Sequence, residues 1–263
     1  MSPPLGSPLM PHSSKVFAGV EVIPLCDAVG PMGPALRRPL DETFLGATAA
    51  DWAVVGREEW VLHFHCHLLR DPTGRTILVD TGVGGTESPA AGWAPVPGAL
   101  MAEVAAAGVR PEDVDAVVLT HLHSDHAGGA VVDGLPAFPN ARYIIQRDEL
   151  DWVRGPVLEQ VVRPLGDALE VVDGLVEMTS GITVVPTPGH TPGHQSVEVG
   201  RLVLSGDVLH HPVQLVNPAI RYAHDEDPER AAATRAALLE RVRRRSGTLA
   251  TAHLAEPFTT LTP

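Results

Sequence analysis

The stretch VVLTHLHSDHAGG, Val117–Gly129, joins an apolar run to a dense set of residue types that bind metals. The apolar run predicts a buried strand that ends at Thr120. The serine and aspartate that follow favour turns and helix N-termini, and the two glycines let the chain turn away. The stretch therefore predicts a strand that delivers polar side chains to the edge of a sheet.

The spacing H-x-H-x-D-H within this stretch predicts two groups of ligands. An exit from strand to turn lets His121 and His123 aim at one point, while Asp125 and His126 aim at a second point nearby. Imidazole and carboxylate are the ligands of zinc, manganese and iron sites. A capped loop with incidental histidines is the alternative, and the rarity of this spacing disfavours it.

Three later segments place further ligand types where apolar strands end. PTPGHTPGH holds His190 in a loop constrained by proline and glycine, LSGD ends on Asp207, and TAH ends on His253. Binding groups gather at such strand ends. Each histidine alone would be an ordinary loop residue, but their joint placement predicts one shared metal site.

A second histidine-rich segment, VLHFHCHLL at residues 61–69, has a different interpretation. On a strand, His63, His65 and His67 share one face, and the intervening residues share the other. Neighbours on one face lie about 7 Å apart. Two of them can converge on one ion, but a straight strand supplies no ligand from another direction. We interpret them as a half-buried sheet face bonded to its neighbours, with a place behind the ligands or in a pocket wall as the alternative.

Composition limits the classes of partner and compartment. Of 263 residues, 44% are hydrophobic and 19% charged, which fits a soluble globular protein. A net charge of −13 argues against nucleic acid, because phosphate binding needs a basic face. Two cysteines build no disulfide framework, the N-terminus lacks a signal-peptide layout, and no apolar run approaches membrane-spanning length. We expect a cytoplasmic protein without a membrane partner, with residues 1–14 disordered and a single domain over 15–263.

Periodicity and turn residues predict strands interspersed with helices. Strands are expected over residues 14–23, 60–69, 76–80, 114–120, 141–146, 182–186, 195–199, 201–205 and 247–252. Helices are expected over residues 98–107, 147–153 and 228–245, and a loop over 29–50. The second and third strands are expected to be neighbours, joined at the Asp71–Gly74 turn. This order favours a layered α/β domain with sheet packed on sheet.

The order H-x-H-x-D-H, G-H-T-P-G-H, S-G-D and a late A-H resembles the metallo-β-lactamase superfamily. The resemblance implies an α+β fold, a four-layer αββα sandwich, with a dinuclear site at one edge of its two sheets. Carried onto this sequence, it implies that one ion is bound by His121, His123 and His190. It implies that the other ion is bound by Asp125, His126 and His253, and that Asp207 bridges the two ions. Asp80 matches a position that orients the site without binding metal, and His194 is expected to pack behind the ligands.

The tail of the motif set, HTPGHQS with GDVLHHPVQ, resembles the branch that holds lactonases and methyl-parathion-type hydrolases. The implied enzyme is a hydrolase with two divalent ions, zinc before manganese or iron, whose bridging hydroxide cleaves a lactone, ester or phosphotriester. Asp125 is expected to accept a proton from the attacking water. His210 stands where related lactonases commonly carry a tyrosine, so we expect it to contact substrate and donate a proton. The further candidates are His211, Tyr222 and His224.

The expected substrate is a small, fairly apolar molecule that fits the loops carrying Trp52, Trp60, Trp93 and Pro95. Asp207 argues against a true β-lactamase, and the lack of a basic face argues against the superfamily's nucleases. An iron-dependent oxidoreductase that resembles persulfide dioxygenases is the alternative, and a metal-binding protein without turnover is a third. Homodimers are common in the family, although no residue here predicts one.

Overall fold

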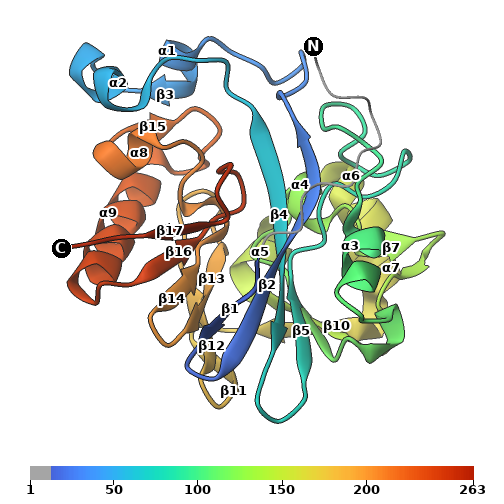
Figure 1. Ribbon diagram of the computed structural model, residues 1–263. Coiled ribbons are helices and arrows are strands. Elements are labelled where there is room, and N and C mark those ends of the chain that lie inside the picture. Colours follow the sequence, from blue (N-terminus) through green and yellow to red (C-terminus); the bar gives the residue numbers. More distant parts are fainter. Residues whose placement is uncertain (1–12) are drawn as a thin grey trace.

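Two β-sheets stack face to face in the computed structural model, which describes residues 13–263. Helices cover the outer face of each sheet (Figure 1). This confirms the expected α+β fold, a four-layer αββα sandwich. The segment 1–14, expected to be disordered, lies outside the described residues except for residues 13 and 14.

The first sheet has the strand order β1-β2-β4-β5-β6-β9-β10. Its strands are β1 (Lys15–Phe17), β2 (Val20–Gly30), β4 (Leu62–Arg70), β5 (Thr76–Val79), β6 (Ala116–Val118), β9 (Arg142–Gln146) and β10 (Leu169–Val172). Strands β4 and β5 pair antiparallel across the Asp71–Gly74 turn, as expected. Strands β5, β6, β9 and β10 run parallel, so the carboxyl ends of β5 and β6 meet at one edge.

The second sheet has the strand order β11-β12-β13-β14-β16-β17. Its strands are β11 (Val176–Thr179), β12 (Ile182–Pro186), β13 (Gln195–Val199), β14 (Leu202–Leu204), β16 (Thr248–Ala250) and β17 (Phe258–Thr260). Strands β14 and β16 are parallel neighbours, and the other pairs are antiparallel. The chain therefore leaves β14 toward Asp207 and β16 toward His253 at the same edge of this sheet.

The main core lies between the sheets and follows the two-residue alternation of strands. Val79 and Val118 of the first sheet belong to one buried cluster with Val184 and Val197 of the second. Each such buried aliphatic side chain contributes about 1.5–3 kcal/mol of transfer free energy. This packing fixes the position of one sheet on the other, and so brings their ligand-bearing edges together.

The α-helices lie in the outer layers and in the connections between strands (Figure 1). They are α1 (Leu40–Thr43), α2 (Ala49–Val55), α3 (Leu100–Ala106), α4 (Ser124–Ala127), α5 (Arg147–Trp152), α6 (Gly155–Val157), α7 (Arg163–Leu165), α8 (Val213–Val216) and α9 (Pro228–Arg244). α3 packs against the first sheet through Leu100 and Val104, whereas α9 packs against the second through Leu238 and Leu239. Among the described residues, no helix has the length and apolarity that a membrane crossing needs.

The prediction of a loop over residues 29–50 is wrong. This range contains the end of β2, α1, the short strand β3 (Phe44–Leu45) and the start of α2. β3 pairs with β15 (Arg221–Tyr222), which is remote in the sequence. Phe44 is fully buried in a cluster that gathers aromatic side chains from several segments. Local periodicity carries no signal for such long-range packing.

Other differences concern the ends and the edges of the sheets. The expected first strand, 14–23, is two strands, because Ala18 and Gly19 both have positive φ and form a tight turn. The edge strands β10, β11 and β17 were not expected. They are three or four residues long and mostly half-exposed, so their apolar alternation is weak. A further small hairpin joins β7 (Val131–Val132) to β8 (Leu135–Pro136).

Candidate metal centre

The chain enters the centre directly from β6. Thr120 fixes this exit because its N–H and its hydroxyl donate to the two carboxylate oxygens of Asp80, at 2.7 and 2.9 Å. Asp80 follows β5 with φ of 62°, a left-handed conformation that is uncommon for residues other than glycine. Two parallel neighbouring strands are therefore tied together where the H-x-H-x-D-H segment begins.

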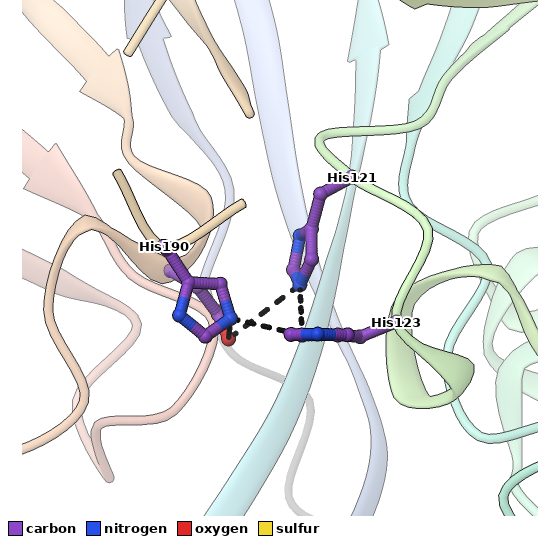
Figure 2. A group of neighbouring side chains, drawn as sticks. His121, His123 and His190 are labelled. Atoms are coloured by element: carbon purple, nitrogen blue, oxygen red, sulfur yellow. Dashed lines mark hydrogen bonds and ion pairs between the residues drawn. The ribbon is translucent and has the colours of Figure 1, made fainter. Parts of the chain in front are cut away.

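Three imidazoles from two segments converge on one point (Figure 2). Nδ1 of His123 lies 3.0 Å from Nε2 of His121 and 2.9 Å from Nε2 of His190. Oδ2 of Asp207 lies 3.3 Å from Nε2 of His190 and 3.8 Å from Nε2 of His121. These four side chains form a group that can hold one metal ion.

A second group lies beside the first. Nε2 of His126 and Nε2 of His253 are 3.3 Å apart, and Oδ2 of Asp125 is 3.5 Å from each of them. Oδ1 of Asp207 lies 3.1 Å from both imidazole nitrogens. Asp207 thus turns Oδ2 to one group and Oδ1 to the other, which is the arrangement of a bridging carboxylate. The structure brings all seven residues expected as ligands together.

The backbone around Asp207 is held from behind by His194. Nε2 of His194 accepts the N–H of Asp207 at 2.9 Å, and its Nδ1 donates to the carbonyl of Thr187 at 3.1 Å. The preceding Gly206 has φ of 50°, and a Cβ there would lie 2.6 Å from Nε2 of His194. Only glycine fits this position, and His194 packs behind the ligands as expected.

The protons on three imidazoles are fixed by oxygen atoms that can only accept hydrogen bonds. The donors and acceptors are Nδ1 of His126 with Oδ2 of Asp80 (2.8 Å), Nδ1 of His190 with Oδ1 of Asp225 (2.9 Å), and Nδ1 of His253 with the carbonyl of His63 (2.9 Å). In the neutral rings, each Nε2 therefore carries a lone pair that faces the centre. Lone pairs of His126 and His253 that face one another at 3.3 Å repel unless a proton or a metal ion lies between them. The residues fit metal ions.

The electrostatics of the two ligand groups support this fit. Burial first, and then neighbouring imidazoles, lower the pKa of His123 to about 3, and burial lowers that of His190 to about 4, so both rings are neutral at pH 7. For His126 and His253, burial opposes protonation, but Asp207 and Asp125 outweigh it and raise the pKa. The group of Asp125, His126 and His253 attracts positive charge, which a divalent ion would supply in place of the protons.

The centre opens into a pocket of about 460 Å³, which is within the range of small-molecule sites. Its lining includes metal-binding groups, among them Asp125, Asp207 and His253. It also includes the apolar side chains of Met32, Leu36, Leu62 and Trp93, which belong to one hydrophobic cluster. The pocket therefore offers both polar and apolar contacts to a ligand.

His210 lines the pocket, as the expected contact with substrate requires. Its Nε2 donates to Oδ2 of Asp207 at 3.1 Å, and its ring stacks on Tyr222 with centroids 3.8 Å apart. Burial lowers the pKa of His210 to about 4. The ring is therefore neutral at pH 7, and its expected part in catalysis stays a prediction. Tyr222 and His224 line the pocket.

Most of the aromatic residues expected around the substrate lie elsewhere. Trp93 lines the pocket, whereas Trp52 and Trp60 pack with Phe44 behind it. The ring of His211 sits in the same cluster, 5.4 Å from the ring of Trp52, and Pro95 packs against Gly30. The interpretation of Trp52, Trp60 and Pro95 as pocket residues is therefore wrong. Trp52 and Trp60 belong to an apolar cluster that sequence spacing does not reveal.

The histidines of β4 are more buried than the expected half-buried face. His65 and His67 are each 3% exposed, and Nε2 of His65 donates to the carbonyl of Leu254 at 2.9 Å. The carbonyl of His63 accepts Nδ1–H of the ligand His253. β4 therefore lies behind the ligands and supports them, which was the alternative interpretation. His63 gives this support through its backbone carbonyl.

A buried ion pair behind His190 was not found from the sequence. Asp225 accepts from His190 and pairs with Nη2 of Arg235 at 3.5 Å. Arg235 is fully buried, and its guanidinium also donates to the carbonyls of Val208, Pro218 and Ile220. The available signal was an arginine within the apolar stripe of α9, which contains Ala231, Leu238, Leu239 and Val242. A cation in such a stripe indicates a buried partner.

The sequence pattern described as "Metallo-beta-lactamase superfamily" matches residues 64–253, which is more than half of the chain. The chain therefore belongs to the metallo-β-lactamase superfamily. Within it, the chain is similar to an N-acyl homoserine lactonase of Bacillus cereus, with 31% identity over 179 residues, 62% of this chain and 67% of the relative. A second N-acyl homoserine lactonase, from a Bacillus species, is 31% identical over 191 residues, 67% of this chain and 71% of the relative.

Solved structures share the fold. The hydrolase AbOPH matches with a TM-score of 0.80 and 22% identity, covering 98% of this chain and 99% of that one. AidC, described as a dizinc quorum-quenching lactonase in complex with a product, matches with a TM-score of 0.77 and 20% identity, covering 95% and 97%. Together with the lactonase relatives, the superfamily membership makes this protein an enzyme, a metallo-hydrolase of the lactonase-like branch.

Proposed function

We propose that this protein hydrolyses the ring ester of lactones, with N-acyl homoserine lactones as the preferred class. The observation that supports this proposal most directly is the position of Asp207. Its two carboxylate oxygens lie 3.1 and 3.3 Å from nitrogens of two separate ligand groups. The names of the curated relatives support the substrate class. They also favour hydrolysis over the iron-dependent oxidoreductase alternative.

Two divalent ions, zinc by preference, would supply Lewis-acid activation of a water molecule and of the substrate carbonyl. The residues that would hold them are His121, His123 and His190 for one, Asp125, His126 and His253 for the other, and Asp207 for both. Five imidazoles and two carboxylates suit zinc and also manganese or iron. The raised pKa of His126 and His253 means that ion binding at the second group releases protons.

Asp125 is the proton acceptor in this proposal. It lines the pocket and is 7% exposed. The neighbouring imidazoles, His126 first, outweigh its burial and lower its pKa, so it is ionised at pH 7. A carboxylate in this position can take the proton that the attacking water loses.

In this proposal Tyr222 acts on the departing ring oxygen, and His210 acts on the substrate amide. Burial, reinforced by Asp207 and other carboxylates, raises the pKa of Tyr222 well above its usual value, so its hydroxyl keeps a proton to share with the departing ring oxygen. Nδ1 of His210 has no hydrogen-bond partner among residues 13–263. Since its Nε2–H donates to Asp207, this Nδ1 can accept a hydrogen bond from the substrate amide.

The apolar side chains of Met32, Leu36, Leu62 and Trp93 would hold the acyl chain, while the metal-binding residues would hold the lactone ring. A lactone without an acyl chain makes only the polar contacts. We therefore expect kcat/KM to rise with chain length and to be lower for aryl esters and phosphotriesters.

The test is a substrate panel with zinc-loaded protein. N-acyl homoserine lactones of increasing chain length are compared with γ-butyrolactone, an aryl ester and paraoxon. We expect kcat/KM for the long-chain lactones to exceed that for the ester and paraoxon at least tenfold. Asp125→Asn should lower kcat about 10²–10⁴-fold, whereas the control Asp173→Asn, an exposed carboxylate, should leave it unchanged.

Two outcomes contradict the proposal. One is paraoxon or aryl ester turnover that exceeds lactone turnover. The other is a protein that hydrolyses none of the panel, holds iron and consumes oxygen with a persulfide substrate, which would favour the oxidoreductase.

A further inference from the structure

Three metal-binding side chains from two adjacent strands meet away from the catalytic pocket. They are Cys26 of β2 and His63 and His65 of β4. Their ligand atoms all lie within 4.8 Å of one another. None of the three lines the pocket of the dinuclear centre. The cluster is therefore a separate group of potential ligands.

The sheet register explains this meeting. Cys26 and His65 are direct partners in the antiparallel β2–β4 ladder, so their side chains leave the sheet on the same face, about 4.5–5.5 Å apart at Cβ. His63 lies two residues along β4 and shares that face. A bulge between Cys26 and Ala28 bends β2 at this place. β2 thus supplies the ligand from another direction that a single straight strand lacks.

The distances and the proton positions suit a tetrahedral ion. Zinc bonds of about 2.0 Å to nitrogen and 2.3 Å to sulfur keep ligand atoms roughly 3.3–3.8 Å apart. Side-chain rotations that move the three ligand atoms by about an ångström would therefore bring them to these distances. Nε2 of His65 donates to the carbonyl of Leu254 at 2.9 Å. The neutral ring therefore carries its lone pair on Nδ1, and a histidine held by a backbone carbonyl in this way is typical of metal ligands.

We propose that Cys26, His63 and His65 form a third metal site, which takes a thiophilic divalent ion, zinc by preference, with water as its fourth ligand. No redox change is involved: the sulfur–metal bond forms as the thiol proton passes to solvent, and the two imidazoles replace coordinated water molecules. Burial, with Glu103 and Asp27 nearby, raises the pKa of the Cys26 thiol to about 12. Uptake of the ion therefore releases one proton per site near neutral pH.

The dinuclear centre has only nitrogen and oxygen ligands, so a thiolate-to-metal charge-transfer band reports the third site alone. The metal-free full-length protein is titrated with Co(II), with near-ultraviolet absorption and bound cobalt per chain as readouts. We expect the wild type to take up one equivalent beyond the two of the catalytic centre and to show the band. Cys26→Ser should lose the band and that equivalent. Cys66→Ser changes the other buried cysteine, on the opposite face of β4, and should keep both.

The absence of a thiolate band in the wild type overturns the site, as does a band that persists in Cys26→Ser. If Cys26→Ser does not fold, as judged by circular dichroism, His63→Ala replaces it. The link from His63 to His253 runs through the backbone carbonyl, which this substitution keeps. Co(II) affinity at the band should then fall at least tenfold, and an unchanged affinity would also overturn the site. The readout does not depend on whether lactones are substrates.

Discussion

Single carboxylates determine which nitrogen of His126 and of His190 faces the centre. Asp80 accepts two hydrogen bonds from Thr120 and one from Nδ1 of His126, and Asp225 accepts one from Nδ1 of His190. With its proton held on Nδ1, each neutral ring presents Nε2 to a cation. These positioning residues control the geometry of the centre without binding metal.

Asp80→Asn tests this control. Asparagine tolerates the positive φ at this position, so the backbone is retained. The amide group replaces one acceptor oxygen with a donor, which cannot hold the proton of His126. We expect one ion to bind about 10–100-fold more weakly, measured by competition with a chromophoric chelator.

The control for Asp80→Asn is Asp133→Asn, because Asp133 also has positive φ but lies exposed in the β7–β8 hairpin. Its metal affinity should equal that of the wild type. Equal affinity in the Asp80→Asn protein would show that Asp80 does not orient a ligand.

For single residues, the sequence predicts the position of a side chain where that residue directly follows a strand. His121, Asp207 and His253 each stand where an apolar run ends, so their convergence could be expected. Asp225 follows no strand of either main sheet, and its partner His190 is 35 positions away. The sequence likewise does not show that Cys26 is opposite His65, because that pairing depends on strand order and on a bulge.

At the scale of elements, α9 supports the loop that carries Asp207, His210 and Asp225. Arg235 binds three backbone carbonyls of this loop and pairs with Asp225. Both side chains of the pair are fully buried. Removal of one partner therefore leaves a buried charge without compensation.

Arg235→Met should lower the free energy of unfolding by about 3–5 kcal/mol. The matched control is Arg244→Met on the same helix, where both partners of the Arg244–Glu240 pair are exposed and the loss should be about 0–1 kcal/mol. Urea unfolding of both proteins measures the difference. Equal losses for the two variants would contradict a supporting role for Arg235.

Asp27 joins the bulge of β2 to two other segments, since its carboxylate accepts the N–H groups of Val83 and Leu100 at 2.7 Å each. Burial raises its pKa to about 6. The folded protein therefore holds this proton more tightly than the unfolded chain. The contribution of Asp27 to stability is fully present below the unfolded pKa near 4 and is lost as the pH rises to about 6.

Unfolding free energies of the wild type and of Asp27→Asn, measured between pH 4 and pH 6.5, test this assignment. The asparagine cannot ionise, so the wild type should lose stability relative to the variant as the pH rises. A difference between the two proteins that stays constant over this range would contradict the raised pKa.

Element prediction succeeded where local pattern and packing agree. The strands at 182–186 and 195–199 match β12 and β13, whose side chains alternate and pack between the sheets. It failed for residues 29–50, because the apolar cluster around Phe44 includes side chains from Val213 and Tyr222. Such remote contacts stabilise short elements that have little intrinsic preference for their structure.

At the scale of the whole molecule, the centre joins the two sheets. His121 and His123 follow the first sheet, whereas Asp207 and His253 follow the second. The resemblance to the superfamily, which rests on the order of motifs, implied a sandwich with its site at a shared edge, and the topology confirms the sandwich. Ions held between the sheets should therefore stabilise the fold as a whole.

Removal of the ions should lower the stability of the folded protein. Free metal at 100 times its Kd stabilises the native state by about 2.7 kcal/mol per site, provided that the unfolded chain does not bind it. Thermal unfolding with and without a chelator measures the effect, and added zinc should restore Tm. If Tm does not change on chelation, the ions do not connect the two sheets.

Anomalous diffraction from crystals of the zinc-loaded enzyme tests the two-ion centre most directly. We expect two peaks at this centre, roughly 3.5–4 Å apart, with one oxygen of Asp207 bound to each ion. A single peak there, or two peaks that Asp207 does not join, would contradict it.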